Sequence, residues 1–422
     1  MNDIVSLKDC PCGYQHPEIK MTVKIGRGLL PKSAEILKNF PKKILVVADN
    51  NTLKASDGLL DVLKNGGFDV SLHCYENCLE ANINDVKEIE KLLQNQEGVL
   101  AVGTGSIGDI CRMASFNANK AFAIFATAPS MDGFASNAAP IIFGNFKETV
   151  QCHGPSVIIG DTDIMAKAPA VLKSSGFGDV IAKYVALLDW KIAAMISDEY
   201  YCPQVAQMVN DALEKTMSLA DSVTKEDPET AQALMEALVV SGLCMILAGS
   251  TRPASAAEHL VSHYWEIKKL ERQERMPLHG EKVGLGTLMI TSLYHKVAEQ
   301  TPSFGSDNVD WDAVYAAYGP NFKKEIDQYN NPSIMDTVDV TLLKEKWPEI
   351  CQLIKKELPT YNKLLKLMQT AKAITTLEGI EVDKQLAAEA VEFHPYMRYR
   401  INLSRLIPML GIKPDFNNLI LR

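Results

Sequence analysis

The chain has little of several features that would place it in other classes of protein. Its 43 lysine and arginine residues are outnumbered by 52 aspartates and glutamates, which gives a formal net charge of -9. Because nucleic-acid binding needs a basic footprint, this balance argues against a nucleic-acid partner. No apolar run reaches the roughly 20 residues that span a bilayer, and the start of the chain has no signal-peptide core. We therefore expect a cytoplasmic protein with no membrane span.

Cysteine is also scarce. The chain has nine, an odd number spread over 422 residues, which is typical of reduced thiols and not of a disulfide framework. One stretch, "CPCGYQH", brings Cys10, Cys12 and His16 together. The C-x-C spacing is not the usual C-x2-C zinc half-site. We therefore favour a structural or incidental role for these three residues over a metal site.

Short apolar runs alternate with amphipathic stretches in the first part of the chain. Two stretches, "SDGLLDVLKNGG" and "NDVKEIEKLLQNQ", have helical periodicity. The apolar runs end at Gly, Asp, Asn, Pro or Thr and predict buried strands, which begin near Lys42, Phe68, Gly98, Ala121 and Ser156. This alternation implies a mostly parallel sheet with both faces covered.

The pattern changes at about residue 165 and is helical from there to the end, as in "ETAQALMEALVVSGLCMILAG". We predict an α/β nucleotide-binding domain over residues 1–165, followed by an all-α domain over residues 166–422. Two-domain enzymes commonly bind their ligands between the domains.

A glycine-rich loop follows the third predicted strand. "VLAVGTGSIGD" has Gly103, Gly105 and Gly108 in a G-x-G-x-x-G arrangement. The usual dinucleotide fingerprint also needs an acid about 20 residues later, and residues 110–131 contain no Asp or Glu. Asp49, which ends the strand "ILVVAD", offers another ribose contact, while residues 105–109 hold the phosphates. The polar loop "TAPSMDGFAS" after the next strand supports this interpretation.

Two of the eight histidines, His259 and His263, are four residues apart in "STRPASAAEHLVSHYWE". Ser255 and Glu258 have the spacing of a capping box, which predicts a helix that begins at Ser255. Both histidines then lie on one face of its first turns. Taken alone, this pair fits ligands and ordinary core or surface residues equally well.

Two further stretches offer ligands. Asp179 follows the glycines of "SSGFGD" at a predicted helix start, and His279 precedes Gly280 in "MPLHGEKVG" at another. One carboxylate and two imidazoles would leave a coordination position open, which is typical of a catalytic metal site.

The order of these pieces resembles the glycerol-1-phosphate dehydrogenases, and the tail "FHPYMRYRINLSRLIPML" resembles their bacterial branch. The family lies within the superfamily of glycerol dehydrogenase, iron-containing alcohol dehydrogenase and dehydroquinate synthase. The resemblance covers nearly the whole chain, from "ILVVADNNT" through "GTGSIGD", "TAPSMDGFAS", "GFGDVIAKY" and "HGEKVG". It implies an N-terminal sheet domain, a C-terminal helical domain and an active site between them.

The resemblance also implies roles for individual residues. Asp179, His259 and His279 match the ligands of one divalent metal ion. His263, Asp132 and Asp179 match catalytic and substrate-contacting positions. The positions that match contacts to NAD(H) or NADP(H) are Asp49, Gly105, Ser106, Ile107, Gly108, Asp109, Thr127, Ala128, Pro129, Ser130 and Ser136.

The implied reaction is reversible hydride transfer between reduced nicotinamide and the C2 carbonyl of dihydroxyacetone phosphate, which gives sn-glycerol 1-phosphate. His263 or a metal-linked water would protonate the product oxygen. The ligand set suits zinc first, then nickel or iron. Asp49 should repel a 2′-phosphate, which favours NAD. Lys183, Arg252 and Lys282 lie near the motifs, but we expect surface roles for them.

Three alternatives stay open. The protein could be a glycerol dehydrogenase that acts on the unphosphorylated polyol, or a lyase like dehydroquinate synthase. The third is an NAD-binding regulator with a relict site, against which the complete ligand set argues. "STRPASAAEH" replaces the glycine-rich run expected ahead of the first metal histidine of the lyase. A homodimer or larger assembly is implied by the resemblance alone.

Overall fold

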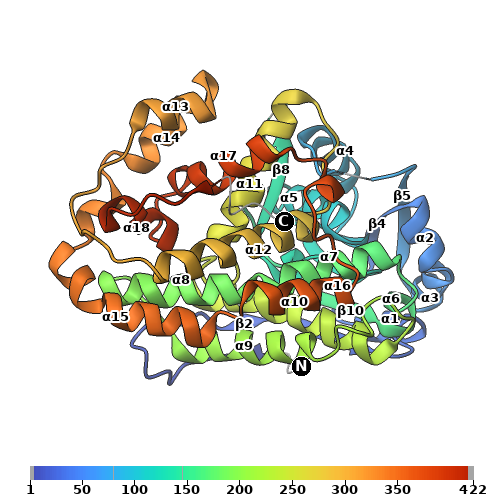
Figure 1. Cartoon of the computed structure of the whole chain (residues 1–422). Coiled ribbons are helices and arrows are strands. Elements are labelled where there is room, and N and C mark those ends of the chain that lie inside the picture. The colour runs from blue at the N-terminus through green and yellow to red at the C-terminus, as the bar shows by residue number, and fades with distance from the viewer. Residues whose placement is uncertain (1–3, 79, 145, 417–422) are drawn as a thin grey trace.

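The N-terminal half is built on one parallel sheet. The computed structural model describes residues 4–78, 80–144 and 146–416. Six strands lie in the order β3-β10-β7-β6-β4-β5, and each neighbouring pair is parallel (Figure 1). Their bounds are β3 Thr22–Gly26, β4 Lys43–Asp49, β5 Asp69–Tyr75, β6 Gly98–Gly103, β7 Ala121–Ala126 and β10 Val157–Asp161.

Helices cover both faces of this sheet, which explains the nearly continuous apolar runs. Ile44, Val46 and Ala48 of β4 join one core with α3 (Leu59–Asn65). The alternate residues Leu45 and Val47 join a second core, with α4 and α5. Side chains alternate across a strand, so a strand buried on both faces must be apolar throughout. The helices of this half are α1 Ser33–Ile36, α2 Asn50–Ala55, α3, α4 Ile83–Leu93, α5 Gly105–Asn117 and α6 Thr162–Met165.

The chain order of the strands reverses its winding direction in the middle of the sheet. From β4 the chain passes to β5 on one side and then to β6 on the other. The carboxyl ends of β4 and β6, at Asp49 and Gly103, therefore flank the point where the winding direction reverses. Ligands of doubly wound sheets bind at this switch point.

After Asp161 the described residues form helices and loops but no strand. These helices are α7 Ala170–Ile181, α8 Lys183–Ile196, α9 Pro203–Met217, α10 Pro228–Ala248, α11 Ala257–Arg272, α12 His279–Ala298, α13 Trp311–Tyr318, α14 Lys323–Asn330, α15 Val340–Glu357, α16 Tyr361–Thr370, α17 Lys384–Phe393 and α18 Leu403–Leu410. The predicted fold class, an α/β part followed by an all-α part, is confirmed.

One helix, α10, is unusually long and apolar. The 21 residues of α10 are long and apolar enough to cross a membrane by length and composition, but 72% of its apolar window is buried inside the protein. It packs against α9 and α7 and shares a core with the sheet. A helix that is apolar all round is typical of such a central position.

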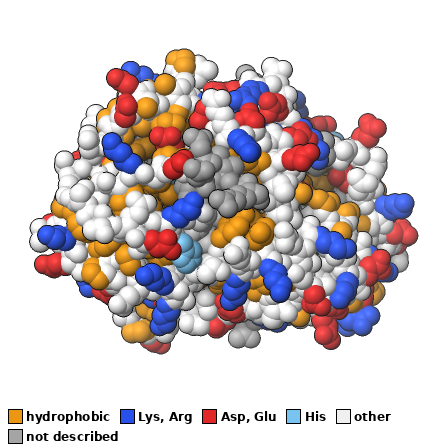
Figure 2. Space-filling model, viewed as in Figure 1, with side chains coloured by type: hydrophobic (Ala, Val, Ile, Leu, Met, Phe, Trp, Pro, Cys, Tyr) orange, Lys and Arg blue, Asp and Glu red, His pale blue; other side chains and the backbone are white. Residues whose placement is uncertain are grey.

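Some strands have no counterpart in the sequence-based prediction. They are β3, the antiparallel pair β1 (Ile4–Val5) and β2 (Ile19–Lys20), and the hairpin of β8 (Ala138–Phe143) and β9 (Phe146–Gln151). Most of these strands are short or partly exposed, so they lack the long apolar runs of the central strands. On the face that Figure 2 shows, basic and acidic side chains are interspersed, with no large basic patch.

Candidate active site

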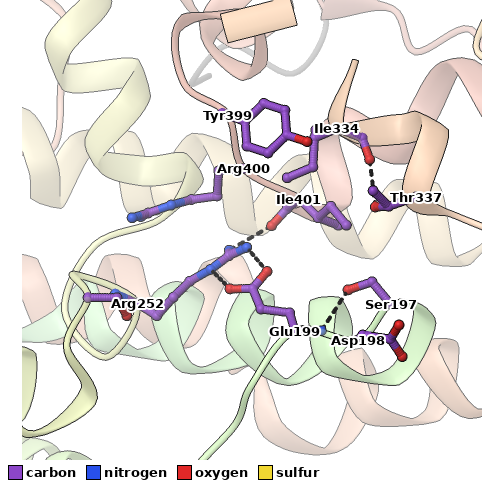
Figure 3. Close-up of a pocket in the computed structure, with 10 residues that line it drawn as sticks. Ser197, Asp198, Glu199, Arg252, Ile334, Thr337, Tyr399, Arg400 and Ile401 are labelled. Atoms are coloured by element: carbon purple, nitrogen blue, oxygen red, sulfur yellow. Dashed lines mark hydrogen bonds and ion pairs between the residues drawn. The ribbon is translucent and has the colours of Figure 1, made fainter. Parts of the chain in front are cut away.

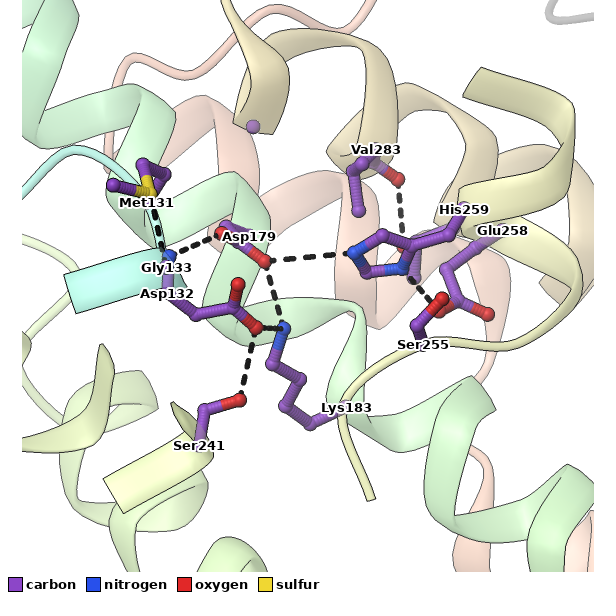
Figure 4. A network of polar contacts seen from close by, with 12 residues as sticks. Met131, Asp132, Gly133, Asp179, Lys183, Ser241, Ser255, Glu258, His259 and Val283 are labelled. Atoms are coloured by element: carbon purple, nitrogen blue, oxygen red, sulfur yellow. Dashed lines mark hydrogen bonds and ion pairs between the residues drawn. The ribbon is translucent and has the colours of Figure 1, made fainter. Parts of the chain in front are cut away.

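Three ligand-type side chains from three helices converge at one point. Asp179 of α7, His259 of α11 and His279 of α12 each place one ligand atom within 4.8 Å of the others. His259 Nε2 lies 3.9 Å from Asp179 Oδ1 (Figure 4). The rings of His259 and His279 are 5.3 Å apart between centroids. Asp179 and His259 are buried, whereas His279 is partly exposed. The structure thus brings together the three residues predicted as metal ligands.

Glycines allow α7 and α12 to approach closely enough for this convergence. A Cβ on Gly178 would lie 2.3 Å from the carbonyl oxygen of Gly280, and one on Gly280 would lie 1.8 Å from that of Ser175. The prediction that the glycines of "SSGFGD" start a helix is wrong, because α7 begins at Ala170 and contains them. They are needed for backbone contact between helices.

Glu258 orients His259. The predicted capping box is wrong: α11 begins at Ala257, and no side chain caps its first residue. The Glu258 carboxylate instead accepts hydrogen bonds from the backbone N–H of Ala256 (2.9 Å) and from His259 Nδ1 (2.7 Å). Because a carboxylate accepts, Nδ1 carries the proton, and Nε2 is left to face Asp179. The amino-acid sequence does not indicate this contact, because neighbouring residues of a helix point in different directions.

A buried ammonium group joins two carboxylates beside this point. Lys183 Nζ lies 2.7 Å from both Asp132 Oδ2 and Asp179 Oδ1, and Ser241 Oγ donates to Asp132 at 2.9 Å (Figure 4). Burial disfavours the charge of Lys183, but the two carboxylates outweigh it and raise its pKa. Burial would raise the pKa of Asp132, yet the attraction of Lys183 and then of His259 lowers it to about 2. The prediction that Lys183 lies at the surface is wrong.

His263 lies one turn beyond His259 and belongs to a second polar group. Its Nδ1 lies 2.9 Å from Glu266 Oε2. Lys282 Nζ lies 3.2 Å from Glu266 Oε1, and Lys147 Nζ of β9 lies 3.5 Å from the same oxygen. Burial lowers the pKa of His263, and Glu266 opposes this effect. Lys282 is buried, so its predicted surface role is also wrong.

The predicted nucleotide contacts gather at the switch point of the sheet. Gly105 begins α5, and the side chain of Thr104 makes no capping hydrogen bond there. Asp49 Oδ1 caps α2 by accepting hydrogen bonds from the backbone N–H groups of Asn51 and Thr52. Its Oδ2 accepts one long hydrogen bond of 3.4 Å from the backbone N–H of Cys78. The second oxygen therefore retains acceptor capacity. The loop of residues 127–130 follows β7, next to β6 in the sheet.

Two predicted nucleotide contacts have structural partners. Asp109 is buried and paired with Arg112, whose guanidinium also donates to backbone carbonyls of residues 133–138. Burial raises the pKa of Asp109 to about 6, against the attraction of Arg112. The Ser136 hydroxyl accepts from Ala138 N at 3.0 Å. These residues thus hold the loop after β7 in place.

Comparison with known proteins shows which family the chain belongs to. The family model for iron-containing alcohol dehydrogenase matches residues 24–169. A glycerol-1-phosphate dehydrogenase (NAD(P)+) of Halalkalibacterium halodurans is 36% identical over 305 residues, which are 69% of this chain and 75% of that protein. The chain belongs to the glycerol-1-phosphate dehydrogenase family. A second family member, from Bacillus licheniformis, is 28% identical over 98% of this chain and 96% of its own length.

The fold agrees with this membership of the glycerol-1-phosphate dehydrogenase family. The solved structure of glycerol dehydrogenase from Schizosaccharomyces pombe superposes with a TM-score of 0.63. The match covers 94% of this chain and 89% of that one at 20% identity, which is a likeness of fold.

Arg252 has a different setting in this family member from the one predicted. It is buried, forms an ion pair with Glu199 and donates to the carbonyl of Ile401 at 2.6 Å (Figure 3). These three residues line a pocket of about 470 Å³, together with Tyr399 and Arg400. The surface role expected for Arg252 is therefore wrong: its guanidinium ties the segment before α11 to the C-terminal part of the chain.

Proposed function

We propose that this protein catalyses the NAD(P)-linked reduction of dihydroxyacetone phosphate to sn-glycerol 1-phosphate and the reverse oxidation. The observation that carries the proposal is the convergence of Asp179, His259 and His279, with His263 one turn away. This set occurs in a chain whose relatives have the name glycerol-1-phosphate dehydrogenase. The switch point of the sheet supports a cofactor site there, because ligands of doubly wound sheets bind at this position.

The described residues suit a divalent ion at this point. The Nδ1 proton of His259 is held by Glu258, so Nε2 has its lone pair available. Burial, with His259 alongside, lowers the pKa of His279 well below its usual value and keeps that imidazole neutral. One carboxylate and two neutral imidazoles leave a coordination position for substrate. A divalent ion bound there would act as a Lewis acid toward the substrate oxygens. Zinc is our first choice, before nickel and iron.

The residues at the switch point would hold NAD(H) or NADP(H). The start of α5 presents backbone N–H groups and the positive end of the helix dipole to a pyrophosphate. Gly105 keeps this turn open, because a Cβ there would lie 3.2 Å from Met131 Cε. Asp49 Oδ2 can accept from a ribose hydroxyl, which favours NAD over a cofactor with a 2′-phosphate. Bound nicotinamide supplies the hydride.

The chain itself supplies charge and proton transfer. Glu266 holds His263 by Nδ1, so proton exchange with the substrate takes place at Nε2. Lys183 neutralises part of the negative charge of Asp132 and Asp179. Asp132 also holds Asp179 through its backbone N–H, which donates to Oδ2 at 2.8 Å. These bonds fix the carboxylate of Asp179 before substrate enters.

An assay of substrate choice tests the proposal. NADH and NADPH oxidation are followed with dihydroxyacetone phosphate, with dihydroxyacetone and with neither, before and after chelation. We expect turnover with the phosphorylated ketone and its loss on chelation. Turnover only with dihydroxyacetone would instead indicate a glycerol dehydrogenase. Absence of turnover with both ketones, in protein loaded with zinc, nickel or iron in turn, would reject the redox function.

Glu258→Gln is expected to weaken metal binding at Asp179, His259 and His279 about 10- to 100-fold, because partners that orient a ligand histidine have effects of this size. Metal affinity is measured by competition with a chromophoric chelator. Glu271→Gln, in the same helix but paired with Lys268, is the control and should keep the native affinity. Equal affinity in both variants would remove Glu258 from the site.

Lys147→Ala is expected to raise KM for dihydroxyacetone phosphate about tenfold. Lys147 and Lys282 both contact Glu266 beside His263. We propose that these two cations bind the phosphate of the substrate. The rate with dihydroxyacetone should not change. Steady-state kinetics with both ketones check this result. Lys87→Ala, at an exposed residue of α4, is the control. A parallel loss with both ketones would contradict a contact to phosphate.

A further inference from the structure

A second cluster of ligand-type side chains lies away from the active site. Cys10, Cys12 and His16 of the N-terminal segment meet Cys202, and their four ligand atoms lie within 4.8 Å of one another. Cys202 is the residue that precedes α9 and is separated from Cys10 by 192 positions in the chain. We propose that these three thiols and one imidazole form a structural zinc site that fastens the N-terminal segment to the helical half.

The spacing of the four atoms is close to that of a tetrahedral site. With zinc–sulfur and zinc–nitrogen bonds of usual length, two sulfurs lie about 3.8 Å apart and a sulfur and a nitrogen about 3.5 Å apart. Cys10 Sγ and Cys202 Sγ are separated by 3.5 Å. His16 Nε2 lies 3.2 Å from Cys12 Sγ and 3.5 Å from Cys202 Sγ. An ion at the centre therefore needs only small shifts of these side chains.

The surroundings prepare His16 as a ligand. Its Nδ1 lies 2.8 Å from the carbonyl oxygen of Leu247, at the end of α10. A carbonyl only accepts, so Nδ1 carries the proton and Nε2 presents its lone pair to the three sulfurs. A ligand histidine held through its other nitrogen is a recurrent feature of zinc sites. His16 is buried, so this orientation is fixed by packing as well.

The sulfur of Cys202 is also held. The backbone N–H of Val205, in the first turn of α9, donates to Cys202 Sγ at 3.4 Å. The hydroxyl of Tyr200 lies 3.6 Å from Cys12 Sγ. Hydrogen-bond donors and a helix N-terminus stabilise thiolates, which are the form that binds metal. Four protein ligands leave no position for substrate, so the site is structural in type.

The sequence-based preference for a structural or incidental role over a metal site rests on the C-x-C spacing alone. The spacing cannot reveal Cys202, which completes the set only through the packing of the N-terminal segment on α9. A disulfide between Cys10 and Cys202 is the chemical alternative. It would require their sulfurs to approach to about 2.05 Å. A disulfide would also not account for the approach of His16 Nε2 to Cys12 Sγ.

Metal analysis and cobalt spectroscopy of the full chain test the proposal. We expect one equivalent of zinc that Cys12→Ser removes and Cys351→Ser, at a cysteine outside the cluster, retains. Cobalt in place of zinc should give thiolate-to-metal charge-transfer absorption, lost in Cys12→Ser but kept in His279→Ala. The three active-site ligands contain no sulfur, so this absorption reports on the cluster alone. The charge-transfer absorption would be unchanged if the proposed catalytic function failed its own test.

A second measurement needs no variant, in case Cys12→Ser does not fold. A mercurial reagent added to the wild-type protein blocks thiols, and released zinc is detected with a chromophoric chelator. We expect release of one equivalent and a lower melting temperature. No release, or no charge-transfer absorption in the cobalt protein, would overturn the proposal. So would a count of seven free thiols in the denatured protein before reduction, because it would show a disulfide among the nine cysteines.

Discussion

His279→Ala is expected to remove one equivalent of metal and to reduce kcat at least 1000-fold. Among the described residues, His279 is one of three metal-ligand side chains that meet at the active-site point, and two remaining ligands hold a divalent ion far more weakly than three. Loss of Lewis-acid stabilisation worth several kcal/mol corresponds to a loss of rate of about this size. Metal content and steady-state turnover with dihydroxyacetone phosphate are measured on the same samples.

His263→Ala separates the role of the metal ligands from proton transfer. It should keep the metal of the wild type but lose about 100- to 10,000-fold in kcat, the usual contribution of a general acid. His295→Ala is the control for removal of a histidine. His295 lies in the last turns of α12, where its Nε2 is hydrogen-bonded to the carbonyl of Pro359. Full metal occupancy in His279→Ala, or metal loss in His263→Ala, would overturn the ligand assignment.

Gly280→Ala is expected to destabilise the protein by about 3 kcal/mol or more and to weaken metal binding at the same time. The new Cβ would lie 1.8 Å from the backbone oxygen of Ser175, so α7 and α12 must move apart. Overpacking commonly costs about 1–3 kcal/mol, and a clash between backbones has no flexible side chain to absorb it. The separation also moves Asp179 away from His279. Denaturant unfolding and metal affinity measure the two effects.

Gly108→Ala is the matched control for stability. Gly108 also lies inside a helix, but a Cβ there meets nothing within 4 Å. Replacing a helical glycine by alanine at an open position should stabilise the protein by about 0.5–1 kcal/mol. A wild-type free energy of unfolding for Gly280→Ala would show that the contact between α7 and α12 is not as close as the structure has it.

The central strands of the sheet could be predicted because burial on both faces leaves a strong local signal. The five apolar runs correspond to β4, β5, β6, β7 and β10. The prediction that all five are buried is wrong for β5, which lies at the edge of the sheet and is exposed or half-buried along its length. The strand that ends at Asp49 and the glycine loop at Gly105 are both readable locally, but the switch point between them was not predicted, because it depends on the order in which distant strands pair. The strand β3 and the hairpin β8–β9 were not predicted, because partly exposed strands have mixed side chains.

Some features of the site had no readable signal. Lys183, Arg252 and Lys282 were expected at the surface, as isolated basic residues usually are. Each of the three is buried and paired with a carboxylate. Arg252 pairs with Glu199 and Lys282 with Glu266, which are distant in the chain or on another helix. Lys183 pairs with Asp179, four positions before it. The carboxylate of Glu258 turns back to its neighbour His259, which helical spacing does not predict.

The amino-acid sequence by itself determined where apolar runs are and which side chains are able to bind metal, because these properties depend on the residues themselves and on neighbours within a few positions. Tertiary structure alone decided which of those side chains meet. Asp179 faces His279 since two glycine-bearing helices pack backbone to backbone, and Cys202 reaches His16 across the contact between the first residues and α9. Such contacts join segments that are distant in the chain, and local periodicity cannot predict them.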